Sequence, residues 1–252
     1  LVGSHTGGYT PFSFDITPAL SAKGVQKLTV KVTDSTDKGF QPHGKQVLEP
    51  HGIWYTPVTG IWQTVWIEPV PAANRIEGIT TRSDIRAGVL SVDVKTARTG
   101  SDRVCVTLSA DGKTLAERSS MAGQPVHLAV EHPRLWSPDD PYLYDLTVTL
   151  LRDGRVIDRA ESYAALREIA TGRDANGIER MTLNGRPLFH FGPLDQGWWP
   201  DGLYTAPTDE ALLYDIRFTK QLGFNMIRKH IKVEPERWYW HCDREGILVW
   251  QD

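Results

Sequence analysis

Six side chains in the last quarter of the chain are rings, carboxylates or a guanidinium, the kinds of group that bind polar ligands. Aromatic rings suit the apolar C–H face of a pyranose, and a carboxylate accepts hydrogen bonds from its hydroxyls. A guanidinium can hold a hydroxyl or orient a neighbouring carboxylate through its paired donors. The predicted substrate-binding residues are Asp195, Trp198, Trp199, Arg228, His230 and Asp252.

Two of these residues, Asp195 and Asp252, raise the question of a catalytic carboxylate pair. Asp195 follows the first of three predicted parallel strands and Asp252 ends the third. Two strand spacings of ~4.8 Å place them about 10 Å apart. This separation exceeds both the ~5–5.5 Å of a retaining glycosidase and the ~6.5–9.5 Å of an inverting one. We therefore do not assign Asp195 and Asp252 as a catalytic pair.

Several of the same residues also fit a purely structural role. Trp198 and Trp199 could pack the loop instead of contacting a ligand, and Arg228 could be an ion-pair partner within the fold. His241 and Cys242 are adjacent in a predicted helix, where neighbouring side chains point in different directions, and no third ligand has suitable spacing. We expect no metal site and no cofactor.

The elements that must position these residues alternate between strand and helix. The predicted strands cover residues 187–194, 224–229 and 247–252, and the predicted helices cover about 208–222 and 235–245. This order is typical of a parallel α/β barrel, the TIM barrel, in which functional residues gather at the C-terminal ends of the strands. Three of about eight barrel strands are accounted for.

The first of these helices has clear end signals. Thr208 is placed to cap its N-terminus, and Gly223 supplies a left-handed residue after its end. The apolar stripe predicted to pack on the sheet consists of Leu212, Ile216, Thr219 and Leu222.

The preceding part of the chain has the pattern of β structure. Strands are predicted over 26–32, where Leu28, Val30 and Val32 alternate with polar residues, and over 61–68. Short strands then follow at intervals of about ten residues, as in a β-sandwich, with hairpin turns at residues 111–112 and 153–154. The clearest of them cover 89–94, 104–108, 126–130 and 143–151. A hairpin turned at residues 184–185 leads into the barrel segment.

Composition narrows the range of partners. The formal net charge is −3 and its signs are interspersed, which argues against nucleic acid and against an anionic membrane surface. No apolar run approaches the ~20 residues of a membrane span, and the first residues lack the pattern of a signal peptide. Cys105 and Cys242 lie in segments of different character and do not indicate a disulfide. The absence of a charged stripe also predicts a neutral substrate.

Three motifs occur in the order found in glycoside hydrolase family 2, the β-galactosidase, β-glucuronidase and β-mannosidase group. Residues 59–69 (TGIWQTVWIEP) resemble the closing strand of its sugar-binding jelly roll. Residues 133–144 (PRLWSPDDPYLY) are similar to a motif of its immunoglobulin-like sandwich, and residues 225–230 (NMIRKH) to its early-barrel signature. Better-known members continue with small residues and then His-Tyr-Pro, where this chain has Lys229, His230, Ile231 and Lys232.

The resemblance implies a multidomain fold, β plus α/β, in three parts. Residues 1–71 would be the C-terminal part of the jelly roll, 72–170 the immunoglobulin-like β-sandwich, and 171–252 the first three strands of the barrel. It also implies retaining hydrolysis of O-glycosidic bonds by two glutamates, after the fourth strand and near the seventh. Both positions lie outside this chain, so no catalytic residue is assigned in it.

Two hypotheses follow from the sequence. The first is a fragment of a β-galactosidase-like hydrolase, inactive by itself, that acts on a carbohydrate. The second is a non-catalytic carbohydrate-binding or scaffold protein. Neither involves nucleic acid or a membrane; homo-oligomerisation stays open, as do the sugar, the linkage and a periplasmic, secreted or cytoplasmic location.

Overall fold

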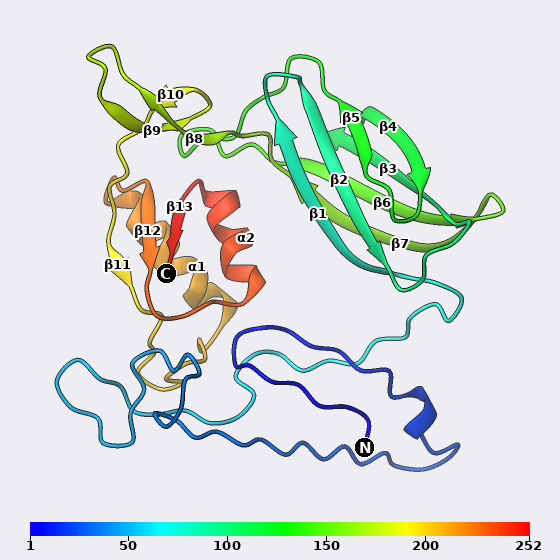
Figure 1. Cartoon of the computed structure of the whole chain (residues 1–252), viewed down its shortest axis with the longest axis vertical. Helices are drawn as coiled ribbons and strands as arrows, with labels where there is room; N and C mark the ends of the chain where they lie inside the picture. Colours follow the sequence, from blue (N-terminus) through cyan, green and yellow to red (C-terminus); the bar gives the residue numbers. More distant parts are fainter. The chain divides into compact units, whose positions relative to one another are not determined.

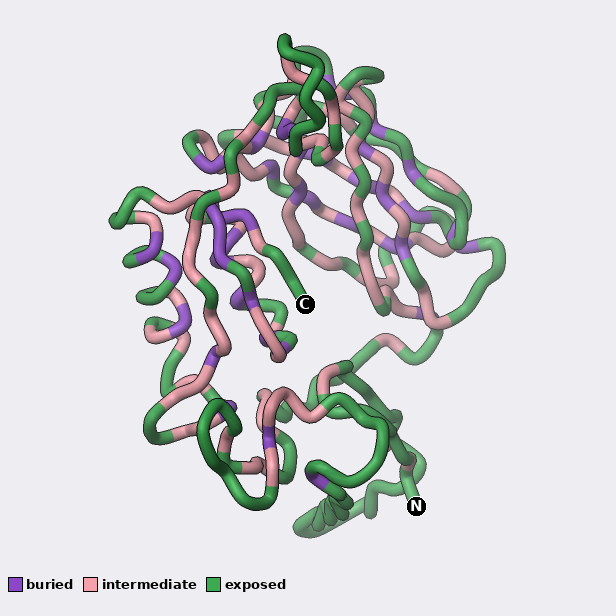
Figure 2. The backbone as a smooth tube through the Cα atoms, turned by 60° about the vertical axis from the view of Figure 1, so that its left-hand side comes forward, coloured by how far each residue is buried: buried purple, intermediate pink, exposed green.

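The computed structural model describes residues 1–252 (Figure 1). Buried positions are concentrated in the strands and helices that follow residue 75, whereas the N-terminal trace is almost wholly exposed (Figure 2). Neither of its two α-helices has the length and apolar character needed to cross a membrane.

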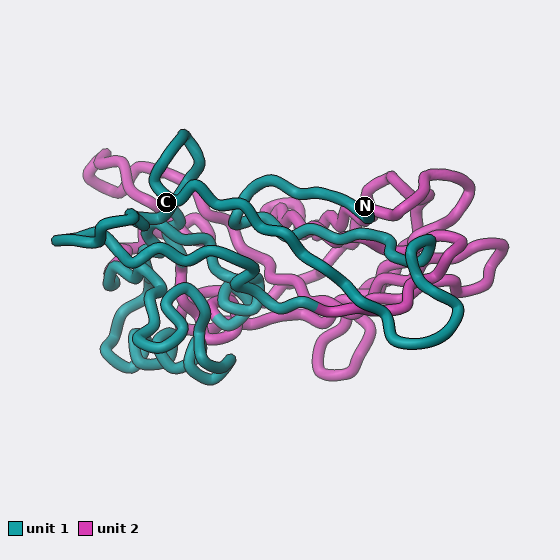
Figure 3. Tube along the Cα trace, turned by 90° about the horizontal axis from the view of Figure 1, so that it is seen from below, with its two compact units in different colours: residues 1–65, 192–241, 249–252 teal, residues 66–191, 242–248 magenta.

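The chain forms two compact units (Figure 3). Unit 1 contains residues 1–65, 192–241 and 249–252, and unit 2 contains residues 66–191 and 242–248. The six predicted substrate-binding residues all belong to unit 1.

Unit 2 contains two antiparallel sheets that share one apolar core. The strands predicted over 89–94, 104–108, 126–130 and 143–151 are all present. Alternate residues point inward along β2, β3 and β6, and their buried side chains form a single cluster. One sheet has the order β1 (Ile76–Asp84), β2 (Val89–Thr96), β5 (Val126–Ala129); the other has the order β4 (Lys113–Met121), β3 (Arg103–Ala110), β6 (Tyr144–Arg152), β7 (Arg155–Ala164).

The three predicted hairpin turns are confirmed. Asp111–Gly112 joins β3 to β4 and Asp153–Gly154 joins β6 to β7, with both residues of each pair at positive φ. Asn184–Gly185 joins β9 (Glu179–Leu183) to β10 (Arg186–Pro187) in the same conformation. This backbone twist matches that of the flanking strands, which explains the preference for Asx-Gly pairs. The strand β8 (Ile169–Arg173) completes this three-stranded sheet.

The C-terminal segment has the predicted alternation of strand and helix. A sheet with the order β11 (Leu194–Asp195), β12 (Met226–Lys229), β13 (Leu248–Gln251) accompanies α1 (Asp209–Gln221) and α2 (Glu236–Glu245), and β11 pairs with β12 in parallel. The first strand is shorter than predicted, since residues 188–193 are not in a strand. Proline has no N–H to donate to a ladder, so Pro187 and Pro193 limit the pairing of this segment.

Helix α1 begins and ends as predicted. The Thr208 hydroxyl accepts a hydrogen bond from the Ala211 N–H (3.1 Å), and Gly223 has a φ of +84°. Leu212, Ile216 and Thr219 are buried, but Leu222 is 58% exposed, so its place in the stripe was wrongly predicted. At 3.6 residues per turn, Leu222 lies about 80° around the helix from Leu212, which takes it off the packed face.

The two strands predicted near the N-terminus are absent. Before β1 the structure has only a short 3-10 helix (Thr17–Ala19) and one isolated bridge pair, Gln46 with Tyr55, and residues 26–32 and 61–68 are in neither. Leu28, Val30 and Val32 are 60%, 56% and 46% exposed. The alternation is that of a strand, but an extended segment becomes a stable strand only when a neighbour pairs with it, and no neighbour pairs with these residues here.

Candidate functional site

The end of β12 separates the predicted site residues into two groups. Successive residues of a strand point to opposite faces. Arg228 is largely exposed and interacts with Asp252, whereas Lys229 is buried and interacts with Asp195. Asp195 pairs with Lys229 across the parallel ladder, and the Asp252 N–H donates to the Lys229 carbonyl. The two groups therefore lie on opposite faces of the same strand ends.

Arg228, His230 and Asp252 form the first group, the strand-end cluster. The Arg228 Nε donates to Asp252 Oδ2 (2.9 Å), and a second guanidinium nitrogen contacts the same oxygen. The other carboxylate oxygen lies 2.8 Å from His230 Nδ1. The hydrogen bonds from Arg228 and His230 hold the pKa of Asp252 below its usual value. All three side chains remain partly exposed, so the cluster can contact a ligand.

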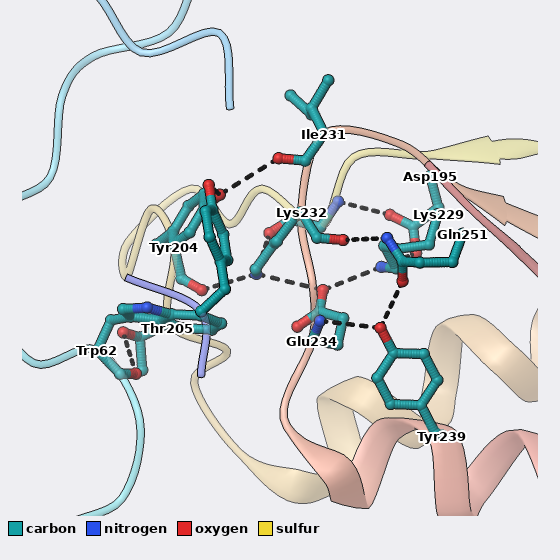
Figure 4. Close-up of polar contacts among 12 residues, drawn as sticks. Trp62, Asp195, Tyr204, Thr205, Lys229, Ile231, Lys232, Glu234, Tyr239 and Gln251 are labelled. Carbon is teal, nitrogen blue, oxygen red and sulfur yellow. Dashed lines mark hydrogen bonds and ion pairs between the residues drawn. The ribbon is translucent and has the colours of Figure 1, made fainter. Parts of the chain in front are cut away.

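The second group, the lysine cluster, contains Asp195, Lys229, Lys232 and Glu234 (Figure 4). Lys229 Nζ lies 2.5 Å from Asp195 Oδ2 and 2.9 Å from Glu234 Oε1. Lys232 Nζ lies 3.2 Å from the same glutamate oxygen, so one carboxylate joins the two ammonium groups. Two lysines and two carboxylates balance in charge, as buried ionic groups require.

The surroundings of the lysine cluster are apolar and aromatic. Lys229 is 1% exposed, and its ammonium lies 4.3 Å from the centre of the Trp238 ring. Lys232 is 2% exposed, and its ammonium lies 5.1 Å from the centre of the Trp62 ring and 4.7 Å from that of the Tyr204 ring. Burial lowers the pKa of Lys232, while Glu234 opposes that change. The ammonium groups are therefore held by specific partners in the interior.

The loop between β11 and α1 carries the two predicted tryptophans. The Trp198 ring stacks on Tyr55 at 4.2 Å between ring centres and meets Tyr204 edge-on at 5.2 Å. The hydroxyl of Tyr204 lies 2.6 Å from that of Tyr9, and burial raises the pKa of Tyr204. Trp199 pairs its backbone with Leu203, and its ring N–H is buried without a partner. Aromatic packing thus holds this loop in place. A contact between its tryptophans and a substrate stays a prediction.

A shallow cavity of about 380 Å³ opens beside this loop. Its lining includes Asp195, Gln196, Trp198 and Asp215. Burial and the nearby charge of Asp195 raise the pKa of Asp215. Because carboxylates supply acceptors, the cavity favours a ligand that supplies donors, such as sugar hydroxyls.

Sequence reasoning did not select Lys229, Lys232 or Glu234. A signal was present, because Lys232 and Glu234 alternate with Ile231 and Val233 between a buried strand and a helix start. Lysine is rarely buried without a partner. In the pair His241–Cys242, which the sequence analysis considered as metal ligands, the histidine contacts a carboxylate. His241 Nε2 lies 3.0 Å from Asp209 Oδ2 at the start of α1.

Comparison with known proteins identifies the family. Residues 74–167 match the model for glycosyl hydrolases family 2. A β-galactosidase of Thermoanaerobacter pseudethanolicus is 24% identical over 100% of this chain and 34% of its own length. A putative β-glucuronidase of Formosa agariphila is 30% identical over 98% of this chain and 23% of its own. The chain belongs to glycoside hydrolase family 2.

Solved structures agree with this family 2 assignment at the level of the fold. The β-glucuronidase of Ruminococcus gnavus superposes with a TM-score of 0.60 at 22% identity, over 71% of this chain and 29% of the other. That of Dictyoglomus thermophilum gives a TM-score of 0.61 at 20% identity, over 71% and 29%. The family 2 chain described here thus spans about a quarter to a third of the length of these relatives.

Proposed function

We propose that this chain is part of a β-galactosidase-like glycoside hydrolase that cleaves O-glycosidic bonds. Its family 2 membership and the names of its relatives, β-galactosidase and β-glucuronidase, support hydrolysis of a glycoside. The mechanism implied by the family resemblance is retaining, with two glutamates. No residue of this chain is assigned to either role.

The assignment of the chain to three domains is part of the same proposal. Residues 1–71 would belong to a jelly roll, 72–170 to an immunoglobulin-like sandwich, and 171–252 to the start of a TIM barrel. The facing sheets of unit 2, with orders β1-β2-β5 and β4-β3-β6-β7, support the second part. The parallel pair β11 and β12, followed in sequence order by α2 and β13, supports the third.

One observation carries the assignment of the site: Asp252 holds Arg228 and His230 together at the exposed ends of parallel strands. The lone pairs of the carboxylate that Arg228 and His230 leave unused, and the remaining guanidinium donors, can bind neighbouring hydroxyls of a sugar ring. Because the pKa of Asp252 is lowered, this carboxylate stays an acceptor at neutral pH. We propose that the strand-end cluster binds the sugar. Asp195, on the opposite face of the strand ends, and the loop after it with Trp198 and Trp199 would form a second part of the substrate site.

Saturation-transfer NMR with methyl β-galactoside on the full 252-residue chain tests this proposal. The wild type should bind the sugar, and Asp252→Asn should abolish most of the signal because the charged acceptor is lost. Asp153→Asn, at the exposed turn between β6 and β7, is the matched control and should bind normally. Equal signals from Asp252→Asn and the wild type would exclude the strand-end cluster as the sugar site.

Hydrolysis is tested separately with nitrophenyl β-glycosides. The 252-residue chain should show no turnover, because binding residues alone cannot protonate a leaving group. Turnover that survives purification and disappears in Asp195→Asn or Asp252→Asn would show that this chain holds its own catalytic carboxylates.

A further inference from the structure

Three members of the lysine cluster, Lys229, Lys232 and Glu234, lie behind the proposed sugar site and have no role in it so far. We propose that Lys229, Lys232 and Glu234 are positioning residues, which fix the loop between β11 and α1 and the end of β12 in the conformation that the sugar meets. What the positioned groups bind rests on the proposed function, whereas the positioning can be measured without any ligand.

The location of Lys229 is the first argument. It lies between Arg228 and His230, and its ammonium is bound on the opposite face by Asp195 and Glu234. An apolar side chain would fill a buried position with a smaller desolvation cost. What the ammonium adds is a fixed geometry, because two carboxylates from different segments must meet at one point.

Lys232 acts on the loop itself. Its ammonium donates to the backbone carbonyls of Gly197 (2.7 Å) and Tyr204 (2.8 Å), which lie on either side of Trp198 and Trp199 in the loop. The third contact is the Glu234 carboxylate. An ammonium group has three donors, and all three have acceptors here. Lys232 therefore links two separate parts of the loop, at Gly197 and at Tyr204, through one buried nitrogen atom.

Gly197 provides independent support for this arrangement. Its φ is +61°, and a Cβ at this position would lie 2.2 Å from Glu234 Oε1 and 2.9 Å from Lys232 Cδ. The loop backbone thus approaches the lysine cluster more closely than any residue with a side chain could. An alanine here would displace the cluster without removing any of its charges.

Backbone and side-chain hydrogen bonds connect the lysine cluster to the strand-end cluster. The His230 N–H donates to the Asp195 carbonyl (2.9 Å), and the Asp252 N–H donates to the Lys229 carbonyl (3.2 Å). Gln251, next to Asp252, donates through Nε2 to the Lys232 carbonyl (2.9 Å). A shift of the buried lysines would therefore reach the sugar-binding groups.

The test is amide hydrogen exchange of the full chain, without ligand, in Lys232→Met and Gly197→Ala. Two controls are matched: Lys113→Met removes an exposed lysine, and Gly223→Ala has the same left-handed strain, at +84°, with no atom within 4 Å of the new Cβ. We expect exchange over residues 194–205 to rise at least tenfold in both cluster variants and to change little in the controls. The apparent dissociation constant of methyl β-galactoside should rise at least tenfold in the same two variants.

Two results would overturn the inference. One is unchanged exchange over residues 194–205 in folded Gly197→Ala, which keeps both lysines and so carries the test if Lys232→Met does not fold. The other is an equal rise in Gly223→Ala, which would make the effect one of backbone strain. A wild type that binds no sugar would contradict the proposed function, while the exchange results would still decide the positioning.

Discussion

The core of unit 2 and the lysine cluster of unit 1 are both buried, but they are built on opposite principles. The unit 2 core consists of apolar side chains that alternate along antiparallel strands, and exchanging one aliphatic residue for another would keep its character. The lysine cluster consists of four charged groups whose positions depend on each other. The first kind of interior supplies stability, and the second fixes geometry at some cost in stability.

The largest expected effect comes from Lys229→Met. Removing this ammonium leaves Glu234 with only Lys232, and it leaves Asp195 without its cation, so we expect a loss of about 3–5 kcal/mol in the free energy of unfolding. Urea denaturation followed by tryptophan fluorescence measures the change. Lys113→Met, at an exposed site, should change it by less than about 0.5 kcal/mol. A similar small value for Lys229→Met would mean that the cluster is not a coupled unit.

Leu128→Ala should cost about 2–5 kcal/mol, through lost burial and the cavity left in the apolar core. Leu128 is fully buried, whereas Leu115 on β4 is 49% exposed, which makes Leu115→Ala a matched control with a much smaller loss. Chemical denaturation of both variants checks the difference. Equal losses would contradict the assignment of β5 to the core.

A smaller effect on stability is expected at a charged group in unit 2, Asp102. Both carboxylate oxygens accept hydrogen bonds from Arg152, and Asn74 donates a further one, which lowers the pKa of Asp102 to about 2. A lowered folded-state pKa adds stability that is present above the unfolded value of about 3.8 and is lost as the pH falls towards 2. Asp102→Asn should lose stability at pH 6 and show a weaker decline between pH 4 and 2. Parallel urea-midpoint curves for the two proteins over that range would exclude this pair as a source of acid sensitivity.

These contrasts also explain what the sequence could predict. Alternating apolar residues and Asx-Gly turns depend on local pattern, so β2, β3, β5 and β6, the three hairpin turns and the ends of α1 were correctly predicted. The alternation around Val30 is equally regular but gave a wrong prediction, because strand formation also depends on a partner.

The site was harder to predict for a related reason. Arg228, His230 and Asp252 were expected at strand ends and were found together there. The partnership of Lys229 with Asp195 joins residues 34 positions apart, and the side of the strand that each occupies depends on the register. Pattern alone therefore did not reveal that Asp195 lies on the opposite face from Arg228.

The most direct test of the proposed sugar site is a titration of methyl β-galactoside against Arg228→Lys, followed by NMR, with the melting temperature measured on the same samples. Lysine keeps the charge but lacks the planar fork that holds Asp252 and a hydroxyl at once. We predict that the affinity falls at least tenfold, about 1.4 kcal/mol, while the melting temperature changes little. Unchanged affinity together with a melting temperature lower by many degrees would show that Arg228 is a structural ion-pair residue, and would contradict the site.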